Sequence, residues 1–185
     1  NLQSKKIVIF GDSFALDIAY LFSYSQFKKD FSLFRPLHPK SNFNEELNYK
    51  FICNDGFFES LKSKGVDLLL FAFDEGYSHL CITSLINKIE QYEIDILFIG
   101  TKNFGDNLNW LSRLDRSNRS KLCQRPSKKY LEIDKLDRKL IPEINYVSFF
   151  ELQGNKNCIP ISNLNGELLS SDRKHLTTAG IEYFA

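Results

Sequence analysis

Two short segments near the ends of the chain carry residues that could perform nucleophilic catalysis. The first, Gly11-Asp12-Ser13, follows directly on the apolar run from Ile7 to Phe10 and precedes a segment of helical character. This position predicts a strand-to-helix turn, at which the Ser13 hydroxyl would project from a sheet edge. The first N–H groups of the helix would then face a developing oxyanion. Taken alone the tripeptide is a weak signal, because serine is also a favoured N-cap residue.

The second segment, Asp172 to Gly180, supplies the partners that a serine nucleophile needs. A hydroxyl is a poor nucleophile at neutral pH until a neighbouring base takes its proton, and histidine does this best when a carboxylate fixes its tautomer. Asp172 and His175 lie three residues apart, so one turn of chain can point both side chains the same way. We therefore predict Ser13 as the nucleophile, His175 as its base and Asp172 as the orienting acid.

The elements that must position these residues alternate between short apolar runs and helical patterns. Strands are predicted at Ile7 to Phe10, Tyr49 to Cys53, Leu68 to Phe73, Ile94 to Ile99 and Tyr146 to Phe150, with a further edge strand at Phe31 to Phe34. Apolar residues spaced by three and four predict helices at Phe14 to Phe27, Phe57 to Lys64, Ser78 to Tyr92 and Ser127 to Leu140. This alternation predicts an α/β fold: a doubly wound, mostly parallel sheet of about five strands with helices on both faces.

Together the two catalytic segments resemble the SGNH, or GDSL-type, hydrolase and acyltransferase family. That family carries G-D-S after its first strand and D-x-x-H-L before a small-residue helix start near the C-terminus, as this chain does. The resemblance spans nearly the whole chain and implies a flavodoxin-like three-layer sandwich. It also implies the triad Ser13, His175 and Asp172, with the Ser13 N–H as one oxyanion donor.

The middle of the chain departs from the family pattern, which has a glycine after the second strand and G-x-N-D after the third. Asn54-Asp55-Gly56 could supply the glycine, so Gly56 is a candidate oxyanion donor. Where G-x-N-D is expected the chain reads Asp74-Glu75-Gly76, and Asn103, one strand later, is the candidate for the missing asparagine. A polar loop residue is the alternative interpretation of Asn103. Loss of this block resembles SGNH domains of bacterial polysaccharide O-acetyltransferases.

Several other residues are candidates for substrate binding. They are Asp12, Asp74 and Glu75 beside the predicted turn, and Arg116 and Arg119 in a locally basic segment. Asp74 and Glu75 could bind sugar hydroxyls or simply place favourable charge at a helix N-terminus. The two arginines could steer an anionic substrate, although a solvated face without a ligand is an equally good interpretation.

Other histidines could act as the base, and aromatic side chains could contact a sugar. His38 and His79 are the alternative bases, since the chain holds three histidines in all. Tyr77 and Trp110 could stack on a sugar ring, but an aromatic residue in a chain with 17 phenylalanines more often packs in the core.

Composition excludes other classes of protein. With 185 residues the chain suits one domain, 1–185, and its 24 basic and 23 acidic residues leave a net charge of +1, which argues against nucleic acid as a partner. Its apolar runs are far shorter than the roughly 20 residues that span a bilayer. The cysteines lack C-x-x-C spacing, so we expect no metal site. The absence of methionine and an end at Ala185 within a helical pattern suggest a domain cut from a longer protein.

The cysteines leave two alternatives open. Cys123 with Cys158 is the pair to test for a disulfide, and four free thiols are the alternative.

We therefore expect a serine-dependent O-acyl, and specifically O-acetyl, transferase or esterase that acts on a carbohydrate or polysaccharide through an acyl-Ser13 intermediate. No bound cofactor is expected; acetyl-CoA or an acetylated carrier would donate the acyl group. The resemblance adds a fused or separate membrane acyltransferase as a partner and leaves the cytoplasm and the periplasmic face of the inner membrane open as locations. The alternatives are a lipid or aryl esterase and an inactive carbohydrate-binding domain. A nucleotide-binding domain would need a glycine-rich phosphate loop that the sequence lacks.

Overall fold

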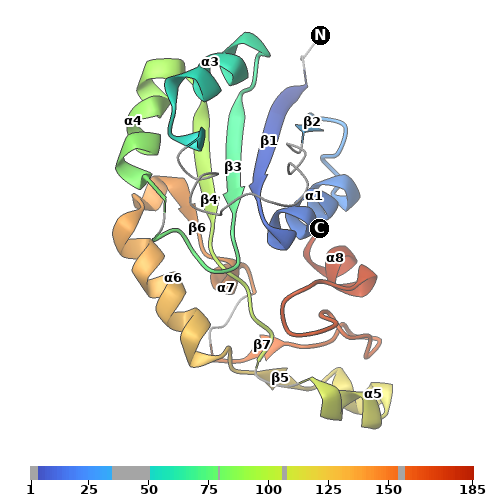
Figure 1. Cartoon of the computed structure of the whole chain (residues 1–185). Helices are drawn as coiled ribbons and strands as arrows, with labels where there is room; N and C mark the ends of the chain where they lie inside the picture. The colour runs from blue at the N-terminus through green and yellow to red at the C-terminus, as the bar shows by residue number, and fades with distance from the viewer. Residues whose placement is uncertain (1–3, 35–50, 79, 106–107, 154–156) are drawn as a thin grey trace, which may run out of the picture.

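The computed structural model describes residues 4–34, 51–78, 80–105, 108–153 and 157–185. They form a five-stranded parallel sheet and a two-stranded ribbon with helices packed around them (Figure 1). The sheet contains β1 (Lys5–Gly11), β2 (Phe31–Phe34), β3 (Leu68–Ala72), β4 (Asp95–Ile99) and β6 (Tyr146–Val147), and the ribbon contains β5 (Cys123–Gln124) and β7 (Ile159–Pro160).

The helices differ in length, and the longer ones connect the strands of the sheet. They are α1 (Ser13–Tyr24), α3 (Asp55–Ser63), α4 (Ile82–Tyr92), α5 (Arg116–Arg119), α6 (Lys128–Leu140), α7 (Phe149–Leu152) and α8 (Thr178–Phe184), with 3₁₀ turns η1 (Asn109–Arg113) and η2 (Glu143–Asn145). None of these helices is long and apolar enough to cross a membrane.

The order of the strands places a topological switch point beside the first strand. The sheet order is β2-β1-β3-β4-β6, and every neighbouring pair is parallel. The chain therefore moves from β1 to one side for β2 and returns to the other side for β3. In open α/β sheets, ligands bind at the carboxyl ends of the strands where the order reverses in this way. Here that position lies between the ends of β1 and β3.

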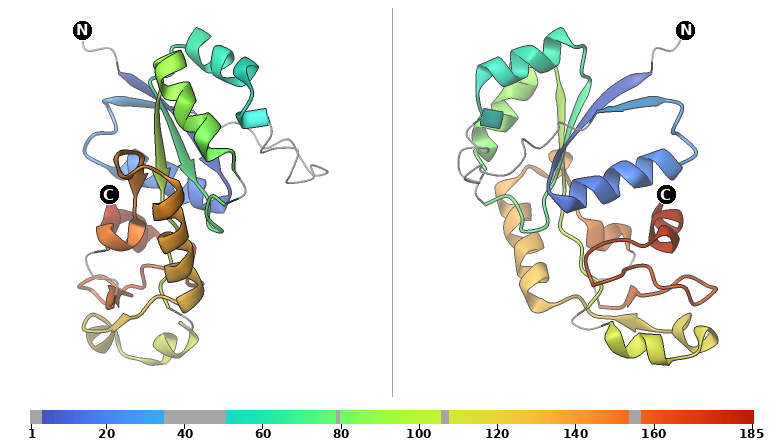
Figure 2. Two further views of the ribbon diagram at one scale, coloured as in Figure 1. Left: turned by 90° about the vertical axis from the view of Figure 1, so that its left-hand side faces the viewer. Right: turned by 45° about the vertical axis from the view of Figure 1, so that its right-hand side comes forward.

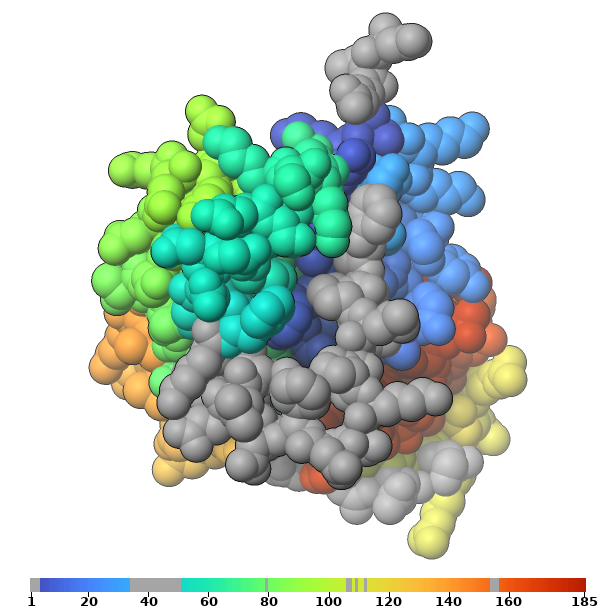
Figure 3. Space-filling view, turned by 45° about the horizontal axis from the view of Figure 1, so that its top comes forward, coloured from blue at the N-terminus to red at the C-terminus, as the bar shows by residue number. Residues whose placement is uncertain are grey.

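The strands alternate their side chains between two apolar cores. Leu69 and Phe71 of β3 join the core beneath α3 and α4, whereas Leu70 and Ala72 join the core beneath α1, α7 and α8. The two further views show helices on both sides of the sheet (Figure 2). In the space-filling view the side chains of α3 and α4 lie side by side (Figure 3). The predicted three-layer α/β architecture is therefore confirmed.

Two motif glycines allow close approaches between segments. Gly11 has φ of 155°, and a Cβ there would lie 1.9 Å from the Ala72 carbonyl oxygen. A Cβ at Gly180 would lie 2.0 Å from the Leu169 carbonyl oxygen. Any larger residue would push β1 away from β3, or α8 away from the segment before the catalytic turn.

Most predicted elements are present, with two corrections. The edge strand at 31–34 is confirmed as β2. The strand predicted from Tyr49 to Cys53 is wrong, since Phe51 and Ile52 are helical and residues 49–50 lie outside the described residues. A short apolar run cannot distinguish a strand from a buried helical turn. The strand predicted from Tyr146 to Phe150 ends at Val147, and its second half forms α7.

Both cysteine pairs form disulfides. Cys123 pairs with Cys158 across the β5–β7 ribbon, as the sequence indicated as one alternative, and Cys53 pairs with Cys81. The Cα–Cα distances are 5.0 and 6.4 Å, within the usual range for disulfides. The second bond ties the start of α3 to the start of α4.

Candidate active site

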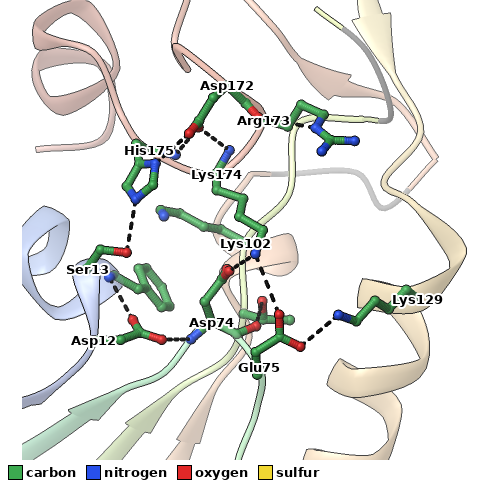
Figure 4. A network of polar contacts seen from close by, with 12 residues as sticks. Asp12, Ser13, Asp74, Glu75, Lys102, Lys129, Asp172, Arg173, Lys174 and His175 are labelled. Atoms are coloured by element: carbon green, nitrogen blue, oxygen red, sulfur yellow. Dashed lines mark hydrogen bonds and ion pairs between the residues drawn. The ribbon is translucent and has the colours of Figure 1, made fainter. Parts of the chain in front are cut away.

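The structure brings together the three residues predicted as a catalytic triad (Figure 4). His175 Nε2 lies 2.9 Å from Ser13 Oγ, and His175 Nδ1 lies 2.6 Å from Asp172 Oδ2. Both separations are hydrogen-bond distances, and they join the three groups in the order nucleophile, base and orienting acid. The half-exposed side chains of His175 and Asp172 leave the triad open to solvent.

Asp12 fixes the nucleophile turn from both sides. Its Oδ1 accepts the Phe14 N–H at 2.8 Å and so caps α1, while its Oδ2 accepts the Asp74 N–H at 2.9 Å. These two bonds hold the start of α1 against the loop after β3, and this presents Ser13 at the switch point. Substrate binding by Asp12 stays a prediction.

The turn that carries the base is organised by Asp172 itself. Asp172 Oδ1 accepts the N–H of Lys174 at 3.0 Å and that of His175 at 2.9 Å, in addition to the ring contact through Oδ2. Arg173, between Asp172 and Lys174, has φ of 87°, which is rare for a residue with a side chain. The carbonyl group of Arg173 accepts the Phe104 N–H at 2.9 Å.

These hydrogen bonds keep the carboxylate ionised. Burial alone would raise the pKa of Asp172, but the hydrogen bonds from the His175 backbone, the His175 ring and the Lys174 backbone outweigh it and lower the pKa to about 2. A carboxylate that is charged throughout the neutral range can hold the Nδ1–H tautomer of His175, which leaves Nε2 free to accept the serine proton.

Beside the triad lies a chain of alternating charges (Figure 4). Lys174 Nζ contacts Asp74 Oδ2 and lies 3.6 Å from Glu75 Oε1, and Glu75 Oε2 lies 2.7 Å from Lys129 Nζ. Lys174 Nζ also sits 5.2 Å from the centre of the Tyr130 ring. The predicted substrate residues Asp74 and Glu75 therefore lie near the triad, although each is already paired with a lysine.

A buried ion pair that the sequence analysis missed lies beneath the triad. Lys102 Nζ is 3.0 Å from Asp17 Oδ2, and their side chains are only 1% and 9% exposed. Asp17 Oδ2 also accepts the Leu176 N–H at 3.1 Å, so the pair joins α1, the loop after β4 and the residue after His175. Asp17, a charged residue in the apolar run from Phe14 to Ala19, was the available signal, because a buried charge is retained only when it is paired. Lys102 lies in a polar loop and gave no such signal.

The three candidate oxyanion donors differ in the hydrogen bonds that they already make. The Ser13 N–H begins α1, where the first N–H groups have no intrahelical acceptor. Gly56 lies in the first turn of α3. Its N–H donates to Oδ1 of Asn54, the N-cap residue of this helix, at 3.1 Å. Asn103 is buried, and its Oδ1 accepts the N–H groups of Gly105 and Ser127. The side-chain oxygen of Asn103 therefore holds a loop together.

The remaining candidates lie elsewhere or have other partners. Arg116 and Arg119 belong to α5, at the lower end of the molecule in every ribbon view, beyond the β5–β7 ribbon (Figures 1 and 2). Tyr77 is fully buried and its hydroxyl donates to backbone carbonyls, so it cannot stack on a sugar. Trp110 is 43% exposed and stays a prediction. His38 and His79 lie outside the described residues.

Neither a protein-family model nor a curated protein matches this sequence. Among the described residues no cluster of three or more His, Cys, Asp or Glu side chains could hold a metal ion.

Proposed function

We propose that this protein is a serine-dependent O-acyl transferase or esterase that forms an acyl-Ser13 intermediate. The observation that carries the proposal is the continuous chain of hydrogen bonds from Ser13 Oγ through His175 to Asp172. A helix-capping serine would need no histidine at 2.9 Å, and a histidine in the core would not be half-exposed beside a serine hydroxyl. The arrangement provides the nucleophile, the base and the orienting acid of acyl transfer.

The first half of the reaction forms the acyl-enzyme. His175 Nε2 takes the Ser13 proton as Oγ attacks the carbonyl carbon of an ester or thioester. The resulting oxyanion accepts the Ser13 N–H at the positive end of α1. Collapse of the tetrahedral intermediate breaks the bond to the leaving alcohol or thiol, which departs with the proton from His175.

The second half transfers the acyl group. His175 removes a proton from an incoming hydroxyl, whose oxygen attacks the acyl carbon. Ser13 Oγ then leaves and takes this proton from His175. Water as the acceptor gives an esterase, and a sugar hydroxyl gives a transferase. We favour a carbohydrate acceptor because the chain resembles polysaccharide O-acetyltransferases in its motif order and in its departure from G-x-N-D.

The disulfides support a location for this activity. Disulfides persist in secreted, periplasmic and other oxidising environments and are rare where thiols are kept reduced. The two bonds of this protein therefore favour the periplasmic side of the membrane over the cytoplasm. There an acetylated carrier, or a membrane acyltransferase that delivers the acyl group, would serve as donor in place of cytoplasmic acetyl-CoA.

Replacing Ser13 with alanine tests the proposal. Ser13→Ala should lower kcat for a small neutral ester such as 4-nitrophenyl acetate by several thousandfold, the scale of loss when a triad member is removed. A fluorophosphonate probe should label the wild-type protein once per chain and leave Ser13→Ala unlabelled.

Ser23→Ala is the matched control, because Ser23 is an exposed residue of the same helix whose hydroxyl donates to the Tyr20 carbonyl oxygen. This variant should keep both hydrolysis and labelling. A folded Ser13→Ala protein with near wild-type turnover would overturn the assignment.

A further inference from the structure

Lys174, the residue before the proposed base, connects the catalytic turn to Asp74 and Glu75 in the loop after β3. Its Nζ contacts Asp74 Oδ2 and reaches Glu75 Oε1 at 3.6 Å, and the Tyr130 ring lies beneath it. The side chain of Lys174 is 31% exposed and that of Asp74 is 10% exposed. This ion pair is thus partly shielded from water, and such pairs are screened much less by salt than exposed ones.

The turn needs such a tie because its catalytic side chains are not held by burial. The side chains of Asp172 and His175 are 52% and 45% exposed, and Arg173 adopts a positive φ that carries a conformational cost. A turn of this kind keeps one geometry only when its surroundings fix it. Lys174 supplies a side-chain anchor between Arg173 and His175.

The anchor point is itself connected to the nucleophile. The backbone N–H of Asp74 donates to Asp12 Oδ2, and Asp12 Oδ1 caps the helix that starts at Ser13. The Asp74 carbonyl group accepts the Thr101 hydroxyl at 2.7 Å, which fixes this loop to the segment after β4. Contacts therefore run in a closed ring from Ser13 through Asp12, Asp74 and Lys174 to His175, and back to Ser13.

We propose that Lys174 and Asp74 form a positioning pair that fixes the distance between His175 Nε2 and Ser13 Oγ. The pair acts through the turn and does not touch the reacting atoms. This inference rests on the proposed acyl-transfer function and adds two residues to its machinery. It also changes the role predicted for Asp74, from a ligand of sugar hydroxyls to a support of the base.

The outer half of the same charge chain offers a matched control. Lys129 pairs with Glu75 at 2.7 Å, but both side chains are more than half exposed. Exposed pairs contribute little to stability. Glu75 reaches the turn through its 3.6 Å contact with Lys174, whereas Lys129 pairs with the other oxygen of Glu75 and is not a member of the ring. Lys129→Met therefore removes the same charge from the same network without loosening the proposed ring.

The test compares Lys174→Met with Lys129→Met on 4-nitrophenyl acetate. Lys174→Met should lower kcat by about tenfold to a hundredfold with KM nearly unchanged, because misplacement of a reacting group by about 1 Å costs on that scale. Lys129→Met should behave as wild type, and Lys174→Arg should restore most of the activity because the guanidinium can still pair with Asp74. An unchanged kcat in Lys174→Met would overturn the positioning role.

Fluorophosphonate labelling separates positioning from unfolding. The final extent of labelling counts folded sites, whereas the rate of labelling reports how well His175 activates Ser13. Lys174→Met should reach the wild-type extent at a rate lowered about as much as kcat. A lowered extent at an unchanged rate would show that Lys174 supports only folding, and would overturn the proposal.

A double-mutant cycle with Asp74→Ala tests whether the two residues act as a unit. Both single variants and the double variant should then lose similar activity, since either change opens the same ring. Strictly additive losses would contradict a pair. Wild-type protein that neither hydrolyses the ester nor labels would overturn the function together with the pair, whereas an active wild type beside an equally active Lys174→Met would remove the pair alone.

Discussion

The carboxylates of Asp172 and Asp137 both accept backbone N–H groups, yet their pKa values move in opposite directions. Asp172, in the half-exposed catalytic turn, accepts two backbone N–H groups and the His175 ring, and its pKa falls to about 2. Asp137, on the buried side of α6, accepts only the Tyr77 N–H at 3.0 Å. Burial raises the pKa of Asp137 to about 6, and its Oδ2 has no hydrogen-bond partner within the described part of the chain.

The balance between burial and hydrogen-bond donors decides the direction of each pKa shift. Three donors outweigh partial burial at Asp172, whereas one donor does not outweigh the burial of Asp137 and the nearby charge of Asp134. The neighbouring Asp134 is also buried, but it accepts the hydroxyls of Tyr146 and Ser148 and pairs with Arg138. The exposed turn should therefore govern activity, and the acidic side of α6 should govern stability.

The largest effect is expected at the turn. Asp172→Asn should lower kcat for 4-nitrophenyl acetate by about 10⁴-fold, because an amide in place of the carboxylate favours the wrong histidine tautomer. The free energy of unfolding in urea should change little, since this side chain is half-exposed. Loss of stability comparable to the loss of activity would show that the two regions are not separable.

Asp134→Ala tests the other half of the comparison. Removing this carboxylate leaves the buried hydroxyls of Tyr146 and Ser148 without their acceptor, at a cost of about 2–4 kcal/mol in the free energy of unfolding. Fluorophosphonate should still label the folded fraction at the wild-type rate. A slower rate at full labelling would instead connect α6 to the chemistry.

The smallest effect concerns pH. The pKa of Asp137 is raised from 3.8 to about 6, so folding binds a proton between these values. Its contribution to the free energy of unfolding falls as pH rises through that window, by at most about 3 kcal/mol. Urea unfolding of wild type and Asp137→Asn at pH 4 and pH 7 should show wild type losing stability relative to the variant at pH 7.

Asp172→Asn is a control whose stability difference from wild type should stay nearly the same between pH 4 and pH 7, because Asp172 titrates below this window. The lowered pKa of Asp172 gives a contribution that is present above its unfolded value near 3.8 and lost as pH falls toward 2. An equal stability difference between Asp137→Asn and wild type at both pH values would show that Asp137 does not titrate in this window.

The sequence by itself determined the strands β1, β3 and β4 and the helices between them, and it singled out Ser13, His175 and Asp172, which the structure brings together. Continuous apolar runs and helical spacing are local properties, and G-D-S with D-x-x-H-L are local motifs, so no tertiary information is needed to find them. The same local character explains the error at Tyr49 to Cys53. An apolar run has the same composition in a strand and in the buried helical turn that includes Ile52.

Only the tertiary structure decided which neighbours support the triad. Asp12, Asp74 and Lys174 are separated by 62 and 100 residues along the chain, and they meet because β1 and β3 end side by side where the catalytic turn returns to the sheet. The burial of Lys102 with Asp17 likewise depends on packing, whereas the bond from the Gly56 N–H to Asn54 is a local helix cap. The type of a residue limits which groups its side chain can pair with. A buried charge or N–H group then pairs with the complementary group that folding brings within reach, so the partner depends on the tertiary structure.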